Sequence, residues 1–195
     1  MTVLIRTLLT TMTFAASVST PAIAAGLQPP EGRSTATATP AATAACASAR
    51  QRQFDFWLGQ WEVSNPAGQL AGRSRIEAIL GGCVLLENWD SPSGVSGKSF
   101  NIFNADSGHW EQFWVDNSGS HLHLVGGMQE GSMVLQGQQD KPDSKTGVIQ
   151  RERIRWTPNA DGSVRQHWET STDDGKTWKT SFDGLYRHPS TGSAR

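Results

Sequence analysis

Net charge is nearly absent from this sequence: 17 Lys and Arg residues offset 18 Asp and Glu residues, which leaves −1 over 195 residues. No basic stripe with interleaved aromatic residues is present, so we do not expect nucleic acid as a partner. Common catalytic motifs are missing too. There is no Gly-x-Ser-x-Gly nucleophile elbow, no His-Glu-x-x-His helix and no phosphate loop. Helical periodicity is also missing, apart from one turn at residues 54–58.

Long apolar runs are confined to the N-terminus. Residues 1–24 have Arg6 as their single charge, an apolar middle and small residues at Ala22 and Ala24, a pattern typical of a secretory signal peptide. The run is short and diluted by Thr, so a membrane anchor is the less favoured alternative. We expect a periplasmic or secreted protein with no membrane span after signal removal.

Bulky apolar side chains are almost lacking in the next segment, residues 25–50, which consists mainly of Ala, Thr, Pro and Ser. Such a composition cannot bury enough surface to offset its conformational entropy. We therefore expect a disordered tether at residues 25–50, a folded domain at residues 51–188, and a disordered tail at residues 189–195.

Only two cysteines are present, Cys46 and Cys83. In an exported chain an even pair usually forms a disulfide, and closing this loop would stabilise the fold by roughly 4 kcal/mol. The alternative is two free thiols. The wide spacing of the two cysteines argues against a metal site.

Tryptophan is abundant, with 8 residues that all lie between Trp57 and Trp178. From residue 54 onward, short segments alternate apolar and polar residues and are separated by clusters of Gly, Asn and Asp. These segments are residues 61–64, 74–80, 83–89, 98–104, 109–116, 121–127, 132–137, 151–157, 164–171 and 178–186. The pattern predicts an all-β meander, closed into a barrel or folded as a sandwich.

Residues 171–178, STDDGKTW, match the Ser-x-Asp-x-Gly-x-Thr-Trp pattern of the Asp-box found on hairpins of sialidase-type propellers. A propeller needs at least about four blades of four strands, which this chain cannot supply, and the pattern occurs once. We therefore expect a hairpin in which Asp173, Asp174 and Gly175 form the turn, and not a glycosidase.

Residues 54–63, FDFWLGQWEV, place Gly59-x-Trp61 at the entry to the first strand. This resembles the Gly-x-Trp opening of lipocalins, in which the Trp lies at the closed end of the barrel. The segments FDFWLGQW, GGCVLLENW, SGHWEQFWVDNSG, GSMVLQG, RIRWTPNADGSVRQHWETSTDDGKTW and FDGLYR appear in this order. Over residues 46–187 they resemble the DUF1579-type family of uncharacterised exported bacterial proteins, regarded as lipocalin-like. The resemblance implies an antiparallel up-and-down barrel of about eight to ten strands and assigns no activity to any residue.

Four of the expected strands have one face that combines aromatic and polar side chains, because alternate residues of a strand share a face. Inside a barrel such faces either fill the interior or line a small cavity. Buried polar groups without partners cost roughly 1–3 kcal/mol each, which favours a cavity over a solid core with Glu87 at its rim. We expect a site for a small apolar molecule or lipid with a polar end, formed by Glu87, Trp89, Gln112, Trp114, Trp156, Gln166 and Trp168.

His121 and His123 share one face of their segment, and this spacing can hold Zn or Cu or ligate haem. No Cys or carboxylate lies close by in the sequence, and Leu122 and Leu124 make the better inward pair. We therefore expect both His side chains on the outside, and no metal or cofactor.

Arg151, Arg153 and Arg155 alternate along one segment, and Arg165 lies on the next. We expect them on a solvated outer wall; the alternative is a clamp for a carboxylate or phosphate.

Three functions remain open. The favoured one is a carrier-type barrel that binds a small molecule. The first alternative is an isomerase or hydrolase that uses a carboxylate in the cavity, such as Glu87 or Asp116. The second is a non-catalytic interaction module of the envelope. A Trp-lined cavity with an isolated carboxylate favours a carrier or enzyme, whereas a filled barrel with an apolar outer patch favours the module.

Overall fold

The computed structural model describes residues 46–190. The expected signal peptide, the tether up to residue 45 and the end of the tail, residues 191–195, lie outside the described residues. The described chain forms ten β-strands and two short 3₁₀ turns, η1 (Asp55–Trp57) and η2 (Leu80–Gly82). The strands are β1 (Gly59–Ser64), β2 (Leu70–Ile79), β3 (Val84–Asp90), β4 (Ser96–Asn104), β5 (His109–Asp116), β6 (His121–Gln129), β7 (Ser132–Gln138), β8 (Arg151–Pro158), β9 (Val164–Ser171) and β10 (Lys179–Arg187).

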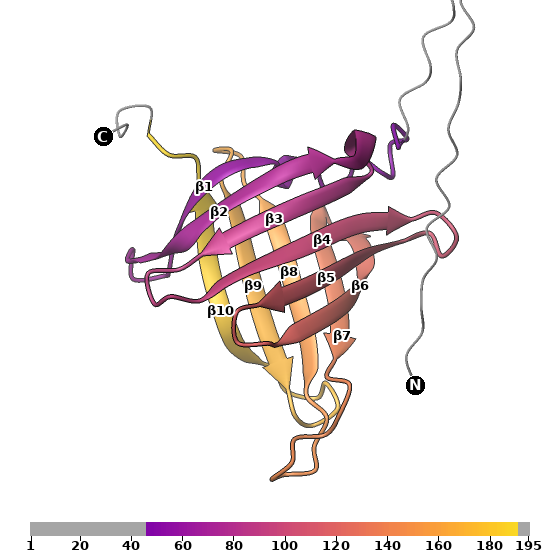
Figure 1. The fold of residues 1–195 in the computed structure, drawn as a ribbon, viewed down its shortest axis with the longest axis vertical. Helices are drawn as coiled ribbons and strands as arrows, with labels where there is room; N and C mark the ends of the chain where they lie inside the picture. The colour runs from indigo at the N-terminus through magenta and orange to yellow at the C-terminus, as the bar shows by residue number, and fades with distance from the viewer. Residues whose placement is uncertain (1–45, 191–195) are drawn as a thin grey trace, which may run out of the picture. The chain divides into compact units, whose positions relative to one another are not determined.

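The strands form one closed antiparallel barrel in which each strand pairs with its neighbours in the chain, and β10 pairs with β1 (Figure 1). Glu62 pairs with Arg187 and Val63 with Tyr186 at the closing seam. The all-β, up-and-down barrel expected from the sequence is thereby confirmed, and the sandwich alternative is wrong. A closed barrel has no free sheet edge, so each strand has a neighbour on both sides.

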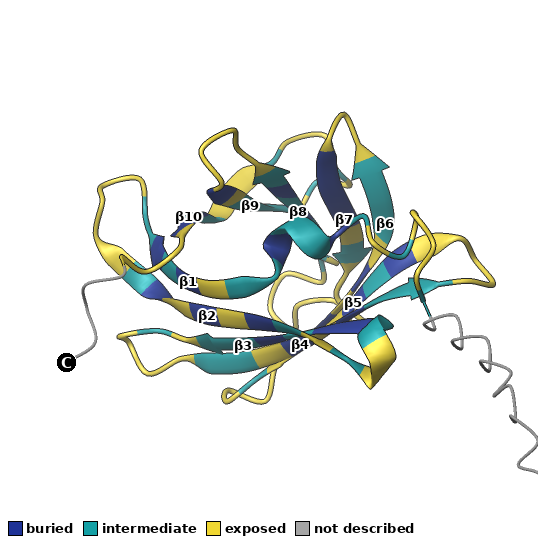
Figure 2. Cartoon of the chain, turned by 90° about the horizontal axis from the view of Figure 1, so that it is seen from above, coloured by how far each residue is buried: buried dark blue, intermediate teal, exposed yellow. Residues whose placement is uncertain are grey.

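The two ends of the barrel differ. The connections at residues 65–69, 91–95, 117–120, 139–150 and 172–178 lie at one end, which we call the open end. The turn η1 covers the other, closed end, where it appears inside the ring of strands when the barrel is seen from above (Figure 2). A side chain's position along its strand therefore fixes its depth in the barrel.

Aromatic rings fill the closed end. Phe54 stacks on Trp57 with ring centroids 5.0 Å apart and contacts the edges of Trp110 and Trp156 at 5.7 and 5.2 Å. The indole N–H of Trp61 donates to the carbonyl of Trp57 at 2.9 Å. These side chains are almost fully buried, and such aromatic contacts add to the stabilisation that their buried area provides.

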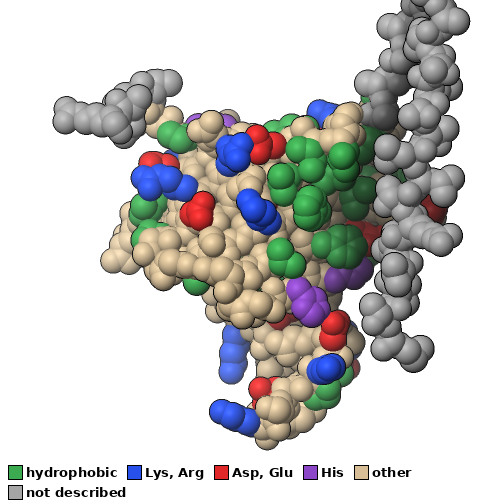
Figure 3. All heavy atoms as spheres, viewed as in Figure 1, with side chains coloured by type: hydrophobic (Ala, Val, Ile, Leu, Met, Phe, Trp, Pro, Cys, Tyr) green, Lys and Arg blue, Asp and Glu red, His purple; other side chains and the backbone are tan. Residues whose placement is uncertain are grey.

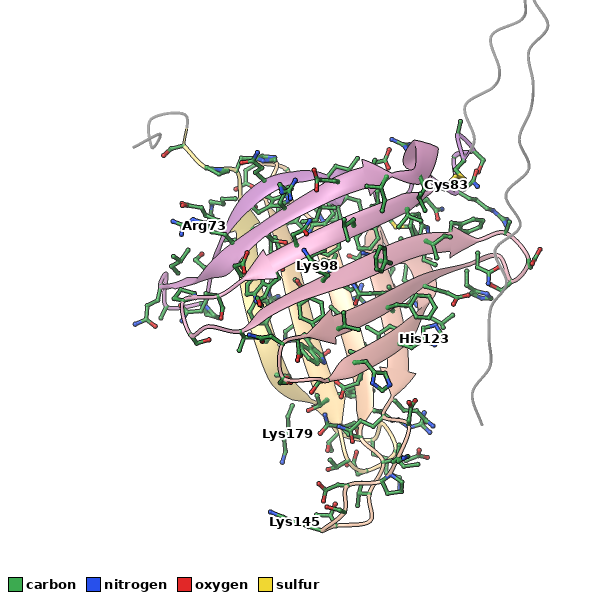
Figure 4. The ribbon with its side chains drawn as sticks, in the orientation of Figure 1. Arg73, Cys83, Lys98, His123, Lys145 and Lys179 are labelled. Atoms are coloured by element: carbon green, nitrogen blue, oxygen red, sulfur yellow. A yellow bond between two sulfur atoms is a disulfide. The ribbon has the colours of Figure 1, made fainter. Side chains whose placement is uncertain are left out.

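Cys46 and Cys83 form a disulfide with Cα atoms 5.0 Å apart, which confirms the predicted pair (Figure 4). Ser48 donates its hydroxyl to the side-chain oxygen of Gln51 at 2.7 Å, so residues 46–50 form an ordered turn beside the barrel. The ordered unit thus begins earlier than residue 51, the boundary expected from composition. Within residues 46–190 no helix is long and apolar enough to cross a membrane.

Candidate ligand-binding site

A cavity of about 250 Å³ lies at the open end of the barrel. Its rim is formed by Val95, Asp116 and Ser181, which lie at or next to the connections of that end. Below the rim come four aromatic side chains, and below these a partly polar floor. The aromatic wall consists of Trp89, Trp114, Trp168 and Phe182. The floor contains Glu87, Gln112, Gln166 and Tyr186, while Leu122 and Ile154 pair with Trp114 and Trp168 and lie beside the wall.

The structure brings six of the seven residues expected at the site to this cavity. Glu87 and Trp89 come from β3, Gln112 and Trp114 from β5, and Gln166 and Trp168 from β9. These pairs are each two residues apart, so each strand contributes one polar group to the floor and one indole to the wall.

Trp156 does not line the cavity, contrary to the expectation from its strand face. It follows Ile154, which lines the cavity, by two residues and therefore lies one step closer to the closed end. Its ring packs against Phe54 and Trp57 and is 0% exposed. Alternation gave the correct face but not the depth of this residue.

A chain of hydrogen bonds crosses four strands beneath the cavity and ends at Glu87. Gln112 Nε2 donates to Asn101 Oδ1 at 2.8 Å, and Asn101 Nδ2 donates to Ser99 Oγ at 2.9 Å. Ser99 then donates to Glu87 Oε2 at 2.9 Å, while Ser74 donates to Glu87 Oε1 at 3.1 Å. Because each donor in the chain points toward Glu87, the network stabilises a negative charge on that carboxylate.

Burial nevertheless dominates the ionisation of Glu87. Desolvation raises the pKa of its carboxyl to about 7, although the hydrogen bonds from Ser99 and Ser74 act in the opposite direction. The phenol of Tyr186 donates to Gln166 Oε1, and burial together with the nearby Glu87 charge raises its pKa well above the usual value. Near neutral pH the floor therefore holds a carboxyl that can take up or release a proton, beside a phenol that stays neutral.

The rim carries a second carboxylate, Asp116. Hydrogen bonds from the side chain and backbone of Ser118 help to lower the pKa of this carboxyl, so it is ionised at neutral pH. Its Oδ2 accepts a hydrogen bond from the indole N–H of Trp114 at 3.3 Å, which links the rim to the aromatic wall.

The polar partners of Glu87 could not be expected from the sequence because β4 has an inverted pattern. Ser99 and Asn101 point inward and are 0% exposed, whereas Phe100 points outward and is 46% exposed. Alternation between small polar and large apolar residues normally indicates the opposite orientation. The cross-strand pairing of Ser99 with Glu87 is what explains the inversion, and it is seen only in the structure.

The inversion leaves an apolar outer face on the same sector of the barrel (Figure 3). Phe100 pairs with Phe113, which is 43% exposed and stacks on His123 with ring centroids 4.3 Å apart. Val115 and Val125 extend this exposed face on β5 and β6. The apolar outer patch named above as a mark of an interaction module is thus present together with a cavity.

Glu152 is a second buried carboxylate, and its burial was not expected from the sequence. It shares the inward face of β8 with Ile154 and Trp156. An acidic residue between arginines is normally expected on the outside of a barrel, so the sequence did not indicate that Glu152 faces inward. Gln150 Nε2 donates to its Oε1 at 2.7 Å, and the indole N–H of Trp168 donates to its Oε2 at 2.6 Å. Glu152 therefore holds Trp168, a residue of the cavity wall, in place.

The two His side chains lie outside the barrel, as expected, with Leu122 and Leu124 buried inside. His123 hydrogen-bonds Glu111 at 3.0 Å, and His121 hydrogen-bonds Asp140 at 2.9 Å. Figure 4 shows His123 on the outer side of β6.

The arginines of β8 and β9 lie on the outer wall, where three of them pair with acidic side chains. Arg153 binds Glu169 at 2.9 Å, Arg165 binds Asp183 at 2.7 Å, and Arg151 binds Asp174. Each of these three guanidinium groups already has a carboxylate partner, which leaves Arg155 as the remaining member of the anion clamp considered as an alternative.

The Asp-box forms the hairpin between β9 and β10. Asp173 accepts hydrogen bonds from the backbone and hydroxyl of Thr177 at 2.9 and 2.6 Å. Gly175 has φ 83° and donates its N–H to Ser171 Oγ at 2.9 Å. The indole of Trp178 lies under the guanidinium of Arg153, whose Cζ is 4.1 Å from the ring centroid, on the outside of the barrel. The motif is thus a turn, and it does not contribute to the cavity lining.

No protein-family model and no curated protein matches this chain. The resemblance to the DUF1579-type family therefore stays a prediction, and the case for a function is carried by the barrel and its cavity alone.

Proposed function

We propose that this chain is an exported, carrier-type β-barrel that binds a small apolar molecule with one polar end. The observation that carries the proposal is the cavity at the open end, with four aromatic side chains above a floor that contains Glu87, Gln112 and Gln166. Ligand sites are mostly apolar and aromatic, with a few polar groups that orient the ligand.

The size of the cavity limits the ligand. A volume of about 250 Å³ lies just below the usual range of roughly 300–1,000 Å³ for drug-sized ligands. The cavity therefore suits a compound of about one ring with a short substituent, and a lipid would leave most of its chain outside.

Export is supported by the N-terminal signal pattern and by the disulfide, which forms and persists in oxidising compartments. Membership of the DUF1579-type family is part of the same proposal. Fractionation of cells that express the full chain should recover the processed protein in the periplasm or medium; unprocessed protein in the cytoplasm would contradict export.

Native mass spectrometry of the protein purified from its own periplasm tests the binding function. We expect a population that carries a small non-covalent adduct, which solvent extraction then releases for identification. The variant Trp114→Ala should lose the adduct, because it removes one side of the aromatic wall. Trp178→Ala is the matched control, since Trp178 lies outside the cavity. Equal retention by both variants would contradict a site in this cavity.

A further inference from the structure

The charge of the cavity lining is one-sided. Two carboxylates line it, Glu87 at the floor and Asp116 at the rim, and within the described chain no Lys, Arg or His side chain lines it. A neutral ligand would not need two carboxylates in its site, and an anionic ligand would meet only charges of its own sign.

Besides a carboxylate, an organic cation is attracted to aromatic rings, and the wall of the cavity provides them. Trp89, Trp114 and Trp168 surround the cavity together with Phe182. A cation within about 6 Å of such a ring is attracted to its negative face, most strongly for Trp and more strongly in a desolvated site. Aromatic rings form the usual surroundings of a quaternary ammonium group, and a carboxylate adds the opposite charge.

The hydrogen bonds of the lining fit the same ligand. The donors of the floor network are already used, because the Gln112 amide, the Asn101 amide and the Ser99 hydroxyl all point along the chain toward Glu87. The indole N–H groups of Trp114 and Trp168 are also used, by Asp116 and Glu152. These groups therefore offer the cavity ring surface and the oxygens of Gln112, Glu87 and Asp116, while Gln166 and Ser181 can still donate.

We infer that the polar end of the ligand is a cation: the cavity takes a small organic ammonium compound with an apolar body, its charge lying near Glu87 and the indoles. This inference rests on the proposed binding function and specifies its ligand class.

Two other titratable or charged groups face the site, the neutral phenol of Tyr186 from β10 and the ionised Asp116 from β5. The neighbouring strands β2 and β4 contribute only the hydroxyls of Ser74 and Ser99 toward Glu87.

Three probes of matched shape test the inference by isothermal titration calorimetry and quenching of Trp fluorescence. They are benzyltrimethylammonium, its neutral carbon analogue neopentylbenzene, and the anionic phenylmethanesulfonate. We expect the cation to bind about tenfold more tightly than the neutral analogue, and the anion to bind most weakly. Because benzyltrimethylammonium does not titrate, its affinity should rise as pH increases from 6 to 8 and Glu87 ionises.

Glu87→Gln is the decisive variant, since it keeps the shape of the side chain and one of its two hydroxyl acceptors while removing the charge. It should weaken binding of the cation about tenfold, abolish the pH dependence and leave the neutral analogue unaffected. If the neutral or anionic probe binds as tightly as the cation, the ammonium inference is overturned while the binding function stands. If none of the three probes binds, the ammonium inference is overturned, and the native mass spectrometry described above decides the binding function.

Discussion

The indole of Trp114 lies directly against Gly97 of the neighbouring strand: a Cβ atom at Gly97 would stand 2.3 Å from Cζ2 and 2.4 Å from Cη2 of that ring. Real Cβ atoms do not approach another carbon so closely, so the ring occupies the place that a side chain at position 97 would take. Trp89 has the same relation to Gly72, where the corresponding distances are both 2.5 Å. Two indoles of the cavity wall are thus positioned by glycines that do not themselves line the cavity.

Gly97→Ala should displace Trp114 and disturb the cavity wall. Overpacking of this kind costs about 1–3 kcal/mol of unfolding free energy, and we expect weaker ligand binding and an altered near-UV circular dichroism spectrum. Gly127→Ala is the matched control, because Gly127 also lies in a strand and a Cβ atom added there would meet nothing within 4 Å. Its stability should stay within about 0.5 kcal/mol of the wild type.

The double variant Gly97→Ala with Trp114→Phe tests the cause of that loss. A smaller ring relieves the clash, so the two changes should be strongly non-additive in urea unfolding, with a coupling of at least about 1 kcal/mol. Additive effects would show that Gly97 is required for some reason other than its contact with Trp114.

The buried Glu87 predicts a pH dependence of stability. Its pKa is raised on folding from 4.5 to about 7, so its contribution to the free energy of unfolding is fully present below pH 4.5 and is lost as pH rises through 7. This shift in pKa corresponds to roughly 3 kcal/mol of that free energy. Glu87→Gln lacks this titration. Its free energy of unfolding relative to the wild type should therefore increase by most of that amount between pH 5 and pH 8, as measured by urea unfolding at both pH values. A constant difference between the two proteins would mean that Glu87 ionises normally.

Much of the barrel could be predicted because local chemistry decides it. The alternation of residues 109–116 and 164–171 gives β5 and β9 with the same bounds as in the structure. Glycine supplies positive φ in several turns between strands, as at Gly94 and Gly119, although Leu80 and Glu130 adopt it too. The choice between a barrel and a sandwich was not local, because it depends on whether β10 pairs with β1, and there the resemblance to lipocalin-like proteins was the deciding argument.

The site could be predicted only in part, because alternation gives the face of a side chain and not its depth or its partners. Trp156 has the right face, yet it lies with the aromatic rings of the closed end. Ser99 and Asn101 are buried by a cross-strand network that no single segment reveals. Phe182 and Tyr186 could have been found, since they alternate on the last strand and both face inward.

The Asp-box turn should contribute to stability and not to binding. Asp173→Ala removes the acceptor for Thr177 and Ser171 and should lower the melting temperature, with ligand affinity retained. Gly175→Val should be worse, because a β-branched residue is strongly disfavoured at φ 83°. Asp106→Ala is the control, an exposed acidic residue in another turn of the barrel. A variant of Asp173 as stable as the wild type that has lost binding would show that the loop is functional.

Acid unfolding tests the same turn independently. Hydrogen bonds from Thr177 lower the pKa of Asp173 from 3.8 to about 2. A carboxyl whose pKa falls on folding stabilises the protein at pH values above its pKa in the unfolded chain. That contribution is lost as pH falls through 2. Asp173→Asn should therefore differ from the wild type most above pH 4 and least near pH 2, as measured by thermal unfolding across that range.

The disulfide should be complete in the exported protein and should contribute substantially to its stability. Cys46 and Cys83 are 37 residues apart, and a loop of that length corresponds to roughly 4 kcal/mol in the chain-entropy model. Thiol titration of the unfolded, unreduced protein should find no free thiol, and two titratable thiols would contradict the bond.

The double variant Cys46→Ser with Cys83→Ser should unfold at a lower urea concentration with its barrel intact. Reducing agent should shift the wild type to the same midpoint and leave the variant unchanged, because the variant has no bond to reduce. The bond joins the turn at residues 46–50 to the start of β3, away from the open end, so affinity for a cavity ligand should survive reduction in the folded protein.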